Sequence, residues 1–127
     1  MTTAPAAIEI ETLARAAIGK LPEAFATHLD NVLLIVEDFA DDAVLDDLGI
    51  KNPFALTGLY HGRPIGEAAV TGDPPPAIYL YRRAILDEWI ESGEELGHLV
   101  SHVVVHEIGH HFGLSDADMH ALEDSAP

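Results

Sequence analysis

The chain has 127 residues, no cysteine and a formal net charge of −16. Without cysteine there are no disulfides, thiolate metal sites or cysteine nucleophile, so any metal must be held by His, Asp or Glu. The acidic excess repels nucleic acid and anionic membranes, and no apolar run reaches the roughly 20 residues that span a bilayer. The length suits one domain over residues 1–127, and because the N-terminus lacks a secretory signal we expect a cytoplasmic protein.

The first half of the chain predicts a helix, a strand and a looped region. Residues 8–29 have the apolar spacing of an amphipathic helix, which Pro22 divides or kinks. Asn31–Glu37 is a short apolar run rich in β-branched residues, typical of a central strand that is buried on both faces. The acidic residues between 38 and 47 lack the frame of a calcium loop and indicate a solvated loop or a short helix. Leu56–Tyr60 is a further short strand candidate.

A second strand is predicted over residues 77–85. Ile78 and Leu80 alternate there with Tyr79 and Tyr81, which gives the strand an aliphatic face and an aromatic face. A short helical connection over residues 86–91 should follow.

The C-terminal part of the chain predicts a long helix. Ser92 is followed three residues later by Glu95, which is the pattern of a capping box at a helix start. The helix should run for about 20 residues, or roughly 30 Å, and end at Gly113, a residue that suits the left-handed position after a helix.

The long helix carries His-Glu-x-x-His at His106, Glu107 and His110, with Gly113 and Asp116 beyond. The two histidines lie one turn apart on one face, so both imidazoles can reach the same metal ion. Glu107 lies about 100° from His106, where it can hold a water molecule beside the metal. The competing interpretation, core histidines bonded to the backbone, does not explain why a buried helix carries three such groups on one stripe.

The motif from His106 to Asp116 resembles the signature of the Asp-zincins, metallopeptidases whose third zinc ligand is an aspartate. Leu80 to Arg83 and residues 106–115 are also similar to the short bacterial mini-zincins. The resemblance implies an α+β fold with a small mixed sheet, a backing helix and a long active-site helix. It further implies a peptide or protein substrate lying along an edge strand, which on this sequence would be Ile78–Arg82.

The resemblance also implies roles for individual residues. His106, His110 and Asp116 would bind zinc, and Gly113 would let the chain turn back to bring Asp116 to the metal. A fourth position open to water marks a catalytic rather than a structural zinc site, with Glu107 as the general base. His120 is the rival third ligand, since it also lies past the turn and imidazole is a common zinc ligand.

Several other residues have more than one interpretation. His102 lies too far along the helix axis to share one ion with His110, and His111 points about 100° away from His110, into the core or behind the ligands. Tyr60, Tyr79 and Tyr81 are candidates for contacting the substrate and its oxyanion, or else they are packing residues. The sequence has no room for a normal Met-turn, because Met119 follows Asp116 by only three residues.

Three functions remain open at this point. The first is a zinc-dependent peptidase, and the second is a non-catalytic binding or interaction module that a metal stabilises. The third is a metal-dependent ribonuclease, which would need a basic groove and a third histidine where this chain has Asp116 and a charge of −16.

Overall fold

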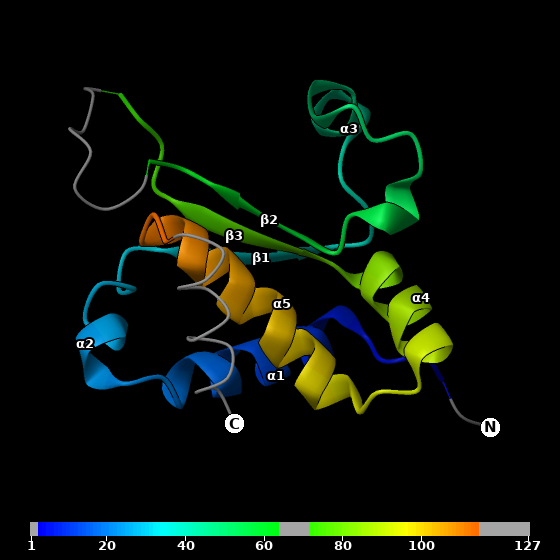
Figure 1. The fold of residues 1–127 in the computed structure, drawn as a ribbon, viewed down its shortest axis with the longest axis horizontal. Coiled ribbons are helices and arrows are strands. Elements are labelled where there is room, and N and C mark those ends of the chain that lie inside the picture. The colour runs from blue at the N-terminus through cyan, green and yellow to red at the C-terminus, as the bar shows by residue number, and fades with distance from the viewer. Residues whose placement is uncertain (1–2, 64–71, 115–127) are drawn as a thin grey trace.

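The computed structural model describes residues 3–63 and 72–114. Within them the chain forms a small α+β fold, as the sequence predicts (Figure 1). The elements in chain order are α1 (Ala7–Gly19), α2 (Glu23–Ala26), β1 (Leu33–Glu37), α3 (Asp42–Leu48), a 3-10 turn (Pro53–Ala55), β2 (Gly58–His61), β3 (Ala77–Tyr81), α4 (Arg82–Ser92) and α5 (Leu96–His111).

The three described strands form one mixed sheet in the order β1-β3-β2. β3 pairs in parallel with β1 and antiparallel with β2. The prediction of a central, fully buried strand over Asn31–Glu37 is therefore wrong, because β1 is an edge strand and both its ends are exposed. The prediction that Ile78–Arg82 forms the edge strand is wrong for the same reason, since β3 lies between the other two strands.

The hydrophobic core lies between one face of the sheet and the helices α1 and α5 (Figure 1). The aliphatic side chains of β3, Ile78 and Leu80, are almost fully buried on this face. α5 contributes apolar residues from more than one side, because it contacts both the sheet and α1. Its fully buried members are Val100, Val104, Val105 and Ile108.

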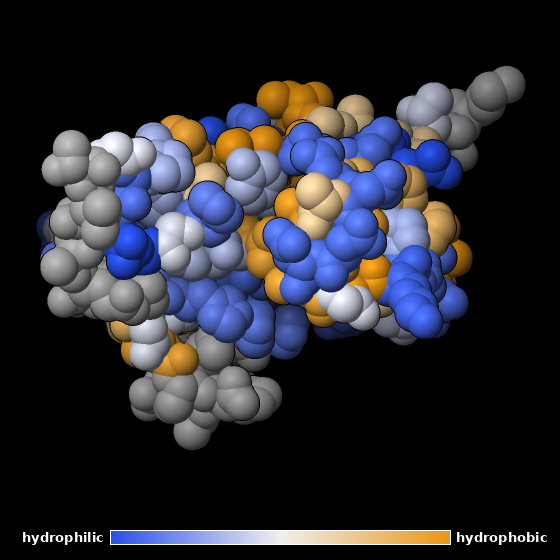
Figure 2. Space-filling model, turned by 90° about the horizontal axis from the view of Figure 1, so that it is seen from above, coloured by the Kyte–Doolittle hydropathy of each residue, from blue (hydrophilic) through white to orange (hydrophobic). Residues whose placement is uncertain are grey.

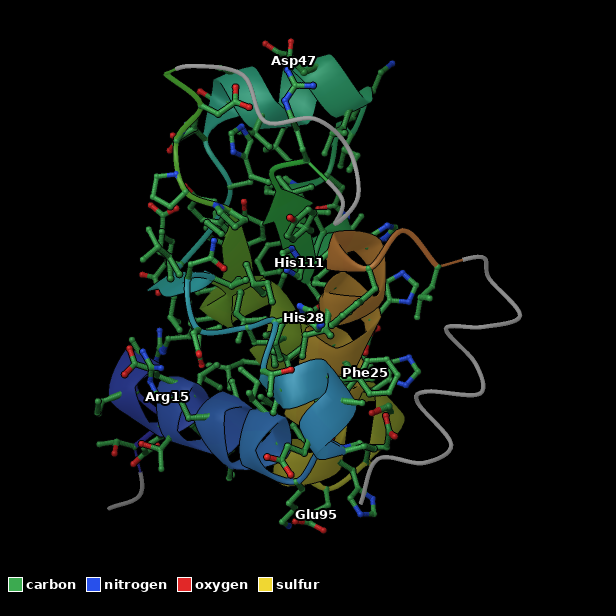
Figure 3. All side chains as sticks on the ribbon, turned by 90° about the vertical axis from the view of Figure 1, so that its left-hand side faces the viewer. Arg15, Phe25, His28, Asp47, Glu95 and His111 are labelled. Atoms are coloured by element: carbon green, nitrogen blue, oxygen red, sulfur yellow. The ribbon has the colours of Figure 1, made fainter. Side chains whose placement is uncertain are left out.

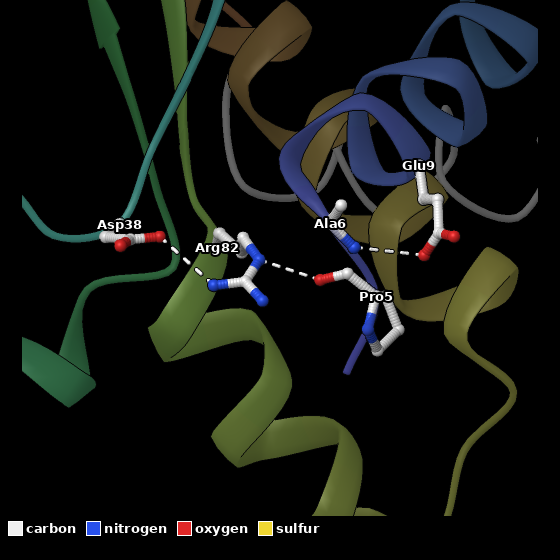
Figure 4. Close-up of polar contacts among 5 residues, drawn as sticks. All are labelled: Pro5, Ala6, Glu9, Asp38 and Arg82. Atoms are coloured by element: carbon white, nitrogen blue, oxygen red, sulfur yellow. Dashed lines mark hydrogen bonds and ion pairs between the residues drawn. The ribbon is translucent and has the colours of Figure 1, made fainter. Parts of the chain in front are cut away.

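The N-terminal helix ends before Pro22 as expected, and α2 follows as a separate short helix. Arg82, at the start of α4, connects the beginning of the chain to the end of β1 (Figure 4). Its Nε donates to the Pro5 carbonyl oxygen at 2.7 Å, and its Nη1 lies 3.2 Å from the Asp38 carboxylate. These contacts fix the start of α1 beside the edge of the sheet.

The boundary between α4 and α5 differs from the prediction. α4 begins at Arg82 and runs to Ser92, so Ser92 ends one helix instead of capping the next. Gly93 adopts a left-handed conformation with φ of 71°, which terminates α4, and Glu95 stands at the N-cap of α5. Short-range capping patterns do not distinguish these arrangements, because Ser92 Oγ still accepts a hydrogen bond from the Glu94 backbone.

The end of α5 agrees with the prediction. Gly113 has φ of 67°, and its N–H donates to the His110 carbonyl oxygen at 3.0 Å. The N–H of Leu114 donates to the Gly109 carbonyl oxygen at 3.0 Å, which completes a Schellman motif. The helix thus ends at His111, one residue after the His-Glu-x-x-His segment.

Among the described residues, α3 and the segments beside it cover part of the second face of the sheet (Figure 1). The acidic stretch after β1 forms α3, one of the two structures that the sequence allowed. No helix in residues 3–63 and 72–114 has the length and apolar character needed to cross a membrane.

Candidate metal centre

α5 brings together His106, Glu107 and His110. One ligand atom from each residue lies within 4.8 Å of the others, as a shared metal ion requires. The imidazole rings of His106 and His110 have centroids 5.1 Å apart, and His110 Nε2 lies 3.9 Å from Glu107 Oε1. The three differ in burial, since Glu107 is buried, His106 is half-buried and His110 is exposed. The group therefore opens from the core towards solvent.

Glu107 lies where α5 passes close to strand β2. A Cβ atom placed on Gly58 would lie 2.7 Å from Val103 Cγ1 and 3.4 Å from Glu107 Cγ. Any larger residue at position 58 would push the helix away from the strand. Gly58 cannot be recognised from the sequence, because no local pattern distinguishes it from the other glycines between residues 49 and 76.

The environment of Glu107 favours the neutral carboxyl group. Burial raises its pKa above the ordinary value, whereas His110, His106 and a hydrogen bond from the Tyr60 backbone act in the opposite direction. Glu107 is thus held by strand β2 on one side and faces the two histidines on the other. A carboxyl group with a raised pKa beside two imidazoles is well placed to accept and release a proton.

His111 connects the end of α5 to two other segments. Its Nδ1 lies 2.6 Å from the Tyr60 hydroxyl, and its Nε2 lies 3.1 Å from the His28 carbonyl oxygen (Figure 3). A carbonyl oxygen only accepts, so Nε2 carries the hydrogen and, in the neutral ring, Nδ1 accepts from Tyr60. Burial lowers the pKa of His111, which favours this neutral form. His111 therefore lies in the core behind the histidines of the motif, one of its two predicted positions.

The other candidate residues are divided between the two faces of the sheet. Tyr60 points towards α5, but Tyr79 and Tyr81 lie on the face that α3 partly covers. Their position on the far face from His106 follows from the strand alternation, because Ile78 and Leu80 occupy the side facing α5. Asp116 and His120, the alternative third ligands, and Met119 lie outside the described residues.

The described donors suit a metal such as zinc. Two imidazole nitrogens one helical turn apart provide two ligands, and the buried carboxylate beside them can hold a water molecule. Further contacts hold these groups in position, because the Tyr60 backbone hydrogen-bonds Glu107 and the His111 ring hydrogen-bonds the Tyr60 side chain.

Comparison with known proteins agrees with this geometry. A family model described as zincin-like metallopeptidase matches residues 29–126, which include β1, the other two strands and the whole of α5. No curated protein matches the chain significantly. Because the family model covers most of the sequence and includes the His-Glu-x-x-His helix, the chain belongs to the zincin-like metallopeptidases.

Proposed function

We propose that this protein is a zinc-dependent peptidase in which Glu107 is the general base. The observation that carries the proposal is the convergence of His106, Glu107 and His110 on α5, with their ligand atoms within 4.8 Å of one another. We assign His106 and His110 as metal ligands and Asp116 as the third ligand. A bound zinc ion would lower the pKa of a water molecule and polarise the carbonyl group of the scissile peptide.

Glu107 then performs the proton transfers. Its carboxylate accepts the proton of the attacking water and passes it to the nitrogen of the leaving amine. The raised pKa brings this carboxyl group closer to neutral pH than an ordinary glutamate, which favours both acceptance and release of a proton. The hydrogen bond from the Tyr60 backbone holds the carboxylate in place during both steps.

Strand β2 is the edge along which the substrate would lie. Tyr81 N–H donates to the Thr57 carbonyl oxygen at 2.9 Å, so by antiparallel alternation Gly58 and Tyr60 turn their backbone groups away from β3. No other strand in residues 3–63 and 72–114 pairs with this edge, so an extended peptide can add to its remaining backbone groups, while the Tyr60 N–H bonds Glu107. β2 also contacts α5 beside Glu107, which would bring the peptide to the base.

The test compares the wild type with Glu107→Gln and His110→Ala. Zinc content is measured for each, and hydrolysis of a mixed peptide library is followed by mass spectrometry. We expect Glu107→Gln to retain zinc and to lose activity by about 10²- to 10⁴-fold, as for other general bases. His110→Ala should lose both zinc and activity. Zinc-loaded wild type that cleaves no faster than Glu107→Gln would contradict the peptidase and favour a metal-stabilised binding module.

The third ligand is tested separately, by Asp116→Ala and His120→Ala. We expect only Asp116→Ala to release zinc. Loss of zinc from His120→Ala alone would assign the third position to His120. Loss of zinc from Glu107→Gln would instead make Glu107 a ligand and exclude it as the base.

A further inference from the structure

The sheet face that points away from α5 contains an open groove of about 460 Å³. β1 contributes Ile35 and Glu37, β3 contributes Tyr79 and Tyr81, and β2 contributes Leu59. Asp41, just before α3, closes one side. The volume falls in the range of roughly 300–1,000 Å³ that is usual for ligand sites. The groove lies across the sheet from His106, so it is separate from the metal centre.

The groove contains the hydroxyl group of Tyr81, a side chain that is otherwise almost fully buried. Tyr81 is only 2% exposed, yet within residues 3–63 and 72–114 its hydroxyl makes no hydrogen bond. No fully enclosed side-chain oxygen in this part of the chain lacks a hydrogen bond, so the Tyr81 oxygen must reach the groove. A tyrosine that is otherwise buried usually bonds its hydroxyl, so this oxygen is available to a ligand.

The groove is negatively charged. Glu37 is the register partner of Tyr81, and both Glu37 and Asp41 are exposed at the rim. Burial raises the pKa of Tyr81 to about 12, with Glu37, Tyr79 and Asp41 adding to the shift, so its hydroxyl stays protonated at neutral pH. Among the described residues that line the groove there is no Lys or Arg, and His61 from β2 is the one imidazole beside the two carboxylates. Seen from this side, the molecule has hydrophilic side chains around scattered hydrophobic ones (Figure 2).

The aromatic rings determine which cation fits. Tyr79 and Tyr81 have ring centroids 6.3 Å apart and planes inclined by only 17°, so they present nearly parallel faces. A planar guanidinium can stack on such a face and still donate to carboxylates at its edge. A flexible alkyl stem can pack on neighbouring apolar side chains, here Ile35 and Leu59.

We propose that this groove binds an arginine side chain of a partner peptide or protein. The guanidinium stacks on Tyr79, donates to the carboxylates of Glu37 and Asp41, and places a donor on the Tyr81 hydroxyl oxygen. The strongly acidic chain, with a formal charge of −16, attracts such basic partners from a distance.

The test measures peptide binding to the zinc-loaded, full-length Glu107→Ala variant by calorimetry and by NMR shift mapping. Three capped tripeptides, Gly-X-Gly with X as arginine, citrulline or lysine, separate charge from shape. We expect the arginine peptide to bind at least about tenfold more tightly than the neutral citrulline peptide, because charge-assisted hydrogen bonds are the stronger ones. The NMR chemical-shift changes that the arginine peptide causes should map to Tyr79 and Tyr81.

Substitutions in the groove provide the matched comparison. Glu37→Gln with Asp41→Asn should weaken arginine binding about tenfold or more. Glu88→Gln with Glu91→Gln removes the same charge from exposed positions on α4 and should change binding by less than about twofold. Tyr81→Phe, which removes only the hydroxyl oxygen, should also weaken binding, whereas a purely packing tyrosine would tolerate it.

Four outcomes would overturn the proposal. The first is equal affinity for the arginine and citrulline peptides, and the second is equal weakening of binding by the double substitution in the groove and the double substitution on α4. The third is a set of NMR shift changes that map to α5, and the fourth is self-association of the protein through this face that excludes the peptide. Because the variant under test lacks the Glu107 carboxylate, the result does not depend on the proposed peptidase activity. If the protein binds the arginine peptide but shows no peptidase activity, the proposal for the groove still holds. If it cleaves peptides but does not bind the arginine peptide, only the proposal for the groove is refuted.

Discussion

The two faces of the sheet differ in apolar character, in charge and in how far they are buried. The face towards α1 and α5 is aliphatic, and Ile78 and Leu80 are buried there at 1% and 0% exposure. The face towards α3 carries Tyr79, Tyr81 and carboxylates, and it remains open as a groove. Both sets of side chains come from one strand, β3, because successive residues point to opposite sides.

The difference shows how one small sheet can support both a hydrophobic core and a candidate metal site. The aliphatic face and two helices form the core, so α5 is held on both sides and its polar stripe is fixed beside β2. The opposite face contributes less burial and retains polar groups for contact with other molecules. Substitutions on the two faces should therefore have unequal consequences.

The largest effect should come from shortening a side chain on the aliphatic face. Leu80→Ala should lower the free energy of unfolding by about 2–5 kcal/mol, because it leaves a cavity between β3 and α5. The matched change on the other face, Leu59→Ala, should lower the free energy of unfolding by clearly less, since Leu59 is only half-buried. Urea denaturation followed by circular dichroism measures both. Equal losses would mean that the two faces are packed alike.

The next effect tests the close approach of α5 to β2. Gly58→Ala should destabilise the protein by about 1–3 kcal/mol, because the added methyl overlaps Val103. It should also reduce peptidase activity by displacing Glu107. The control is Gly19→Ala, where the added Cβ meets nothing within 4 Å. If Gly58→Ala left the free energy of unfolding unchanged, the helix would be able to shift without an energetic cost.

An effect of similar size on stability is expected at the hydrogen bond between Tyr60 and His111. Tyr60→Phe should cost about 1–3 kcal/mol, because it leaves Nδ1 of a buried imidazole without its donor. Thr12→Val, which removes a hydroxyl from the exposed side of α1, is the control. Thermal unfolding compares the two variants, and a Tyr60→Phe cost no greater than the control would argue against the bond.

The smallest effect concerns the ionisation of Tyr81. The unfolded chain releases this proton near pH 10 and the folded chain only near pH 12, so stability should fall as the pH rises through that window. Ultraviolet titration should show a late-titrating tyrosine that Tyr81→Phe removes. Glu37→Gln with Asp41→Asn should bring its pKa closer to 10, since both carboxylates contribute to the shift. An unchanged titration would mean that burial, with Tyr79 and Glu107, raises the pKa without these two carboxylates.

Much of the candidate site follows from local sequence. The spacing of His106, Glu107 and His110 fixes their relative positions on any helix, and Gly113 ends that helix as expected. The alternation of Ile78 to Tyr81 likewise separates aliphatic from aromatic side chains in any strand. These features depend only on neighbours within one or two turns.

Contacts between distant segments are the part that local patterns could not provide. The apolar run of β1 predicted a central strand, but strand order depends on which backbones pair, and β3 took the centre. The clearance at Gly58 and the link from His111 to Tyr60 join residues that are 45 or more positions apart. The same holds for Glu37 and Tyr81, which meet only through the parallel pairing of β1 with β3.

The sequence by itself determined the helix that carries His106, Glu107 and His110, the family and the two-sided character of strand β3, because helix and strand periodicity fix side-chain directions locally. Only the tertiary structure decided which strand is the edge beside Glu107 and which face of the sheet carries the tyrosines. Those features depend on strand pairing and on the packing of α5, which act between segments far apart in the chain.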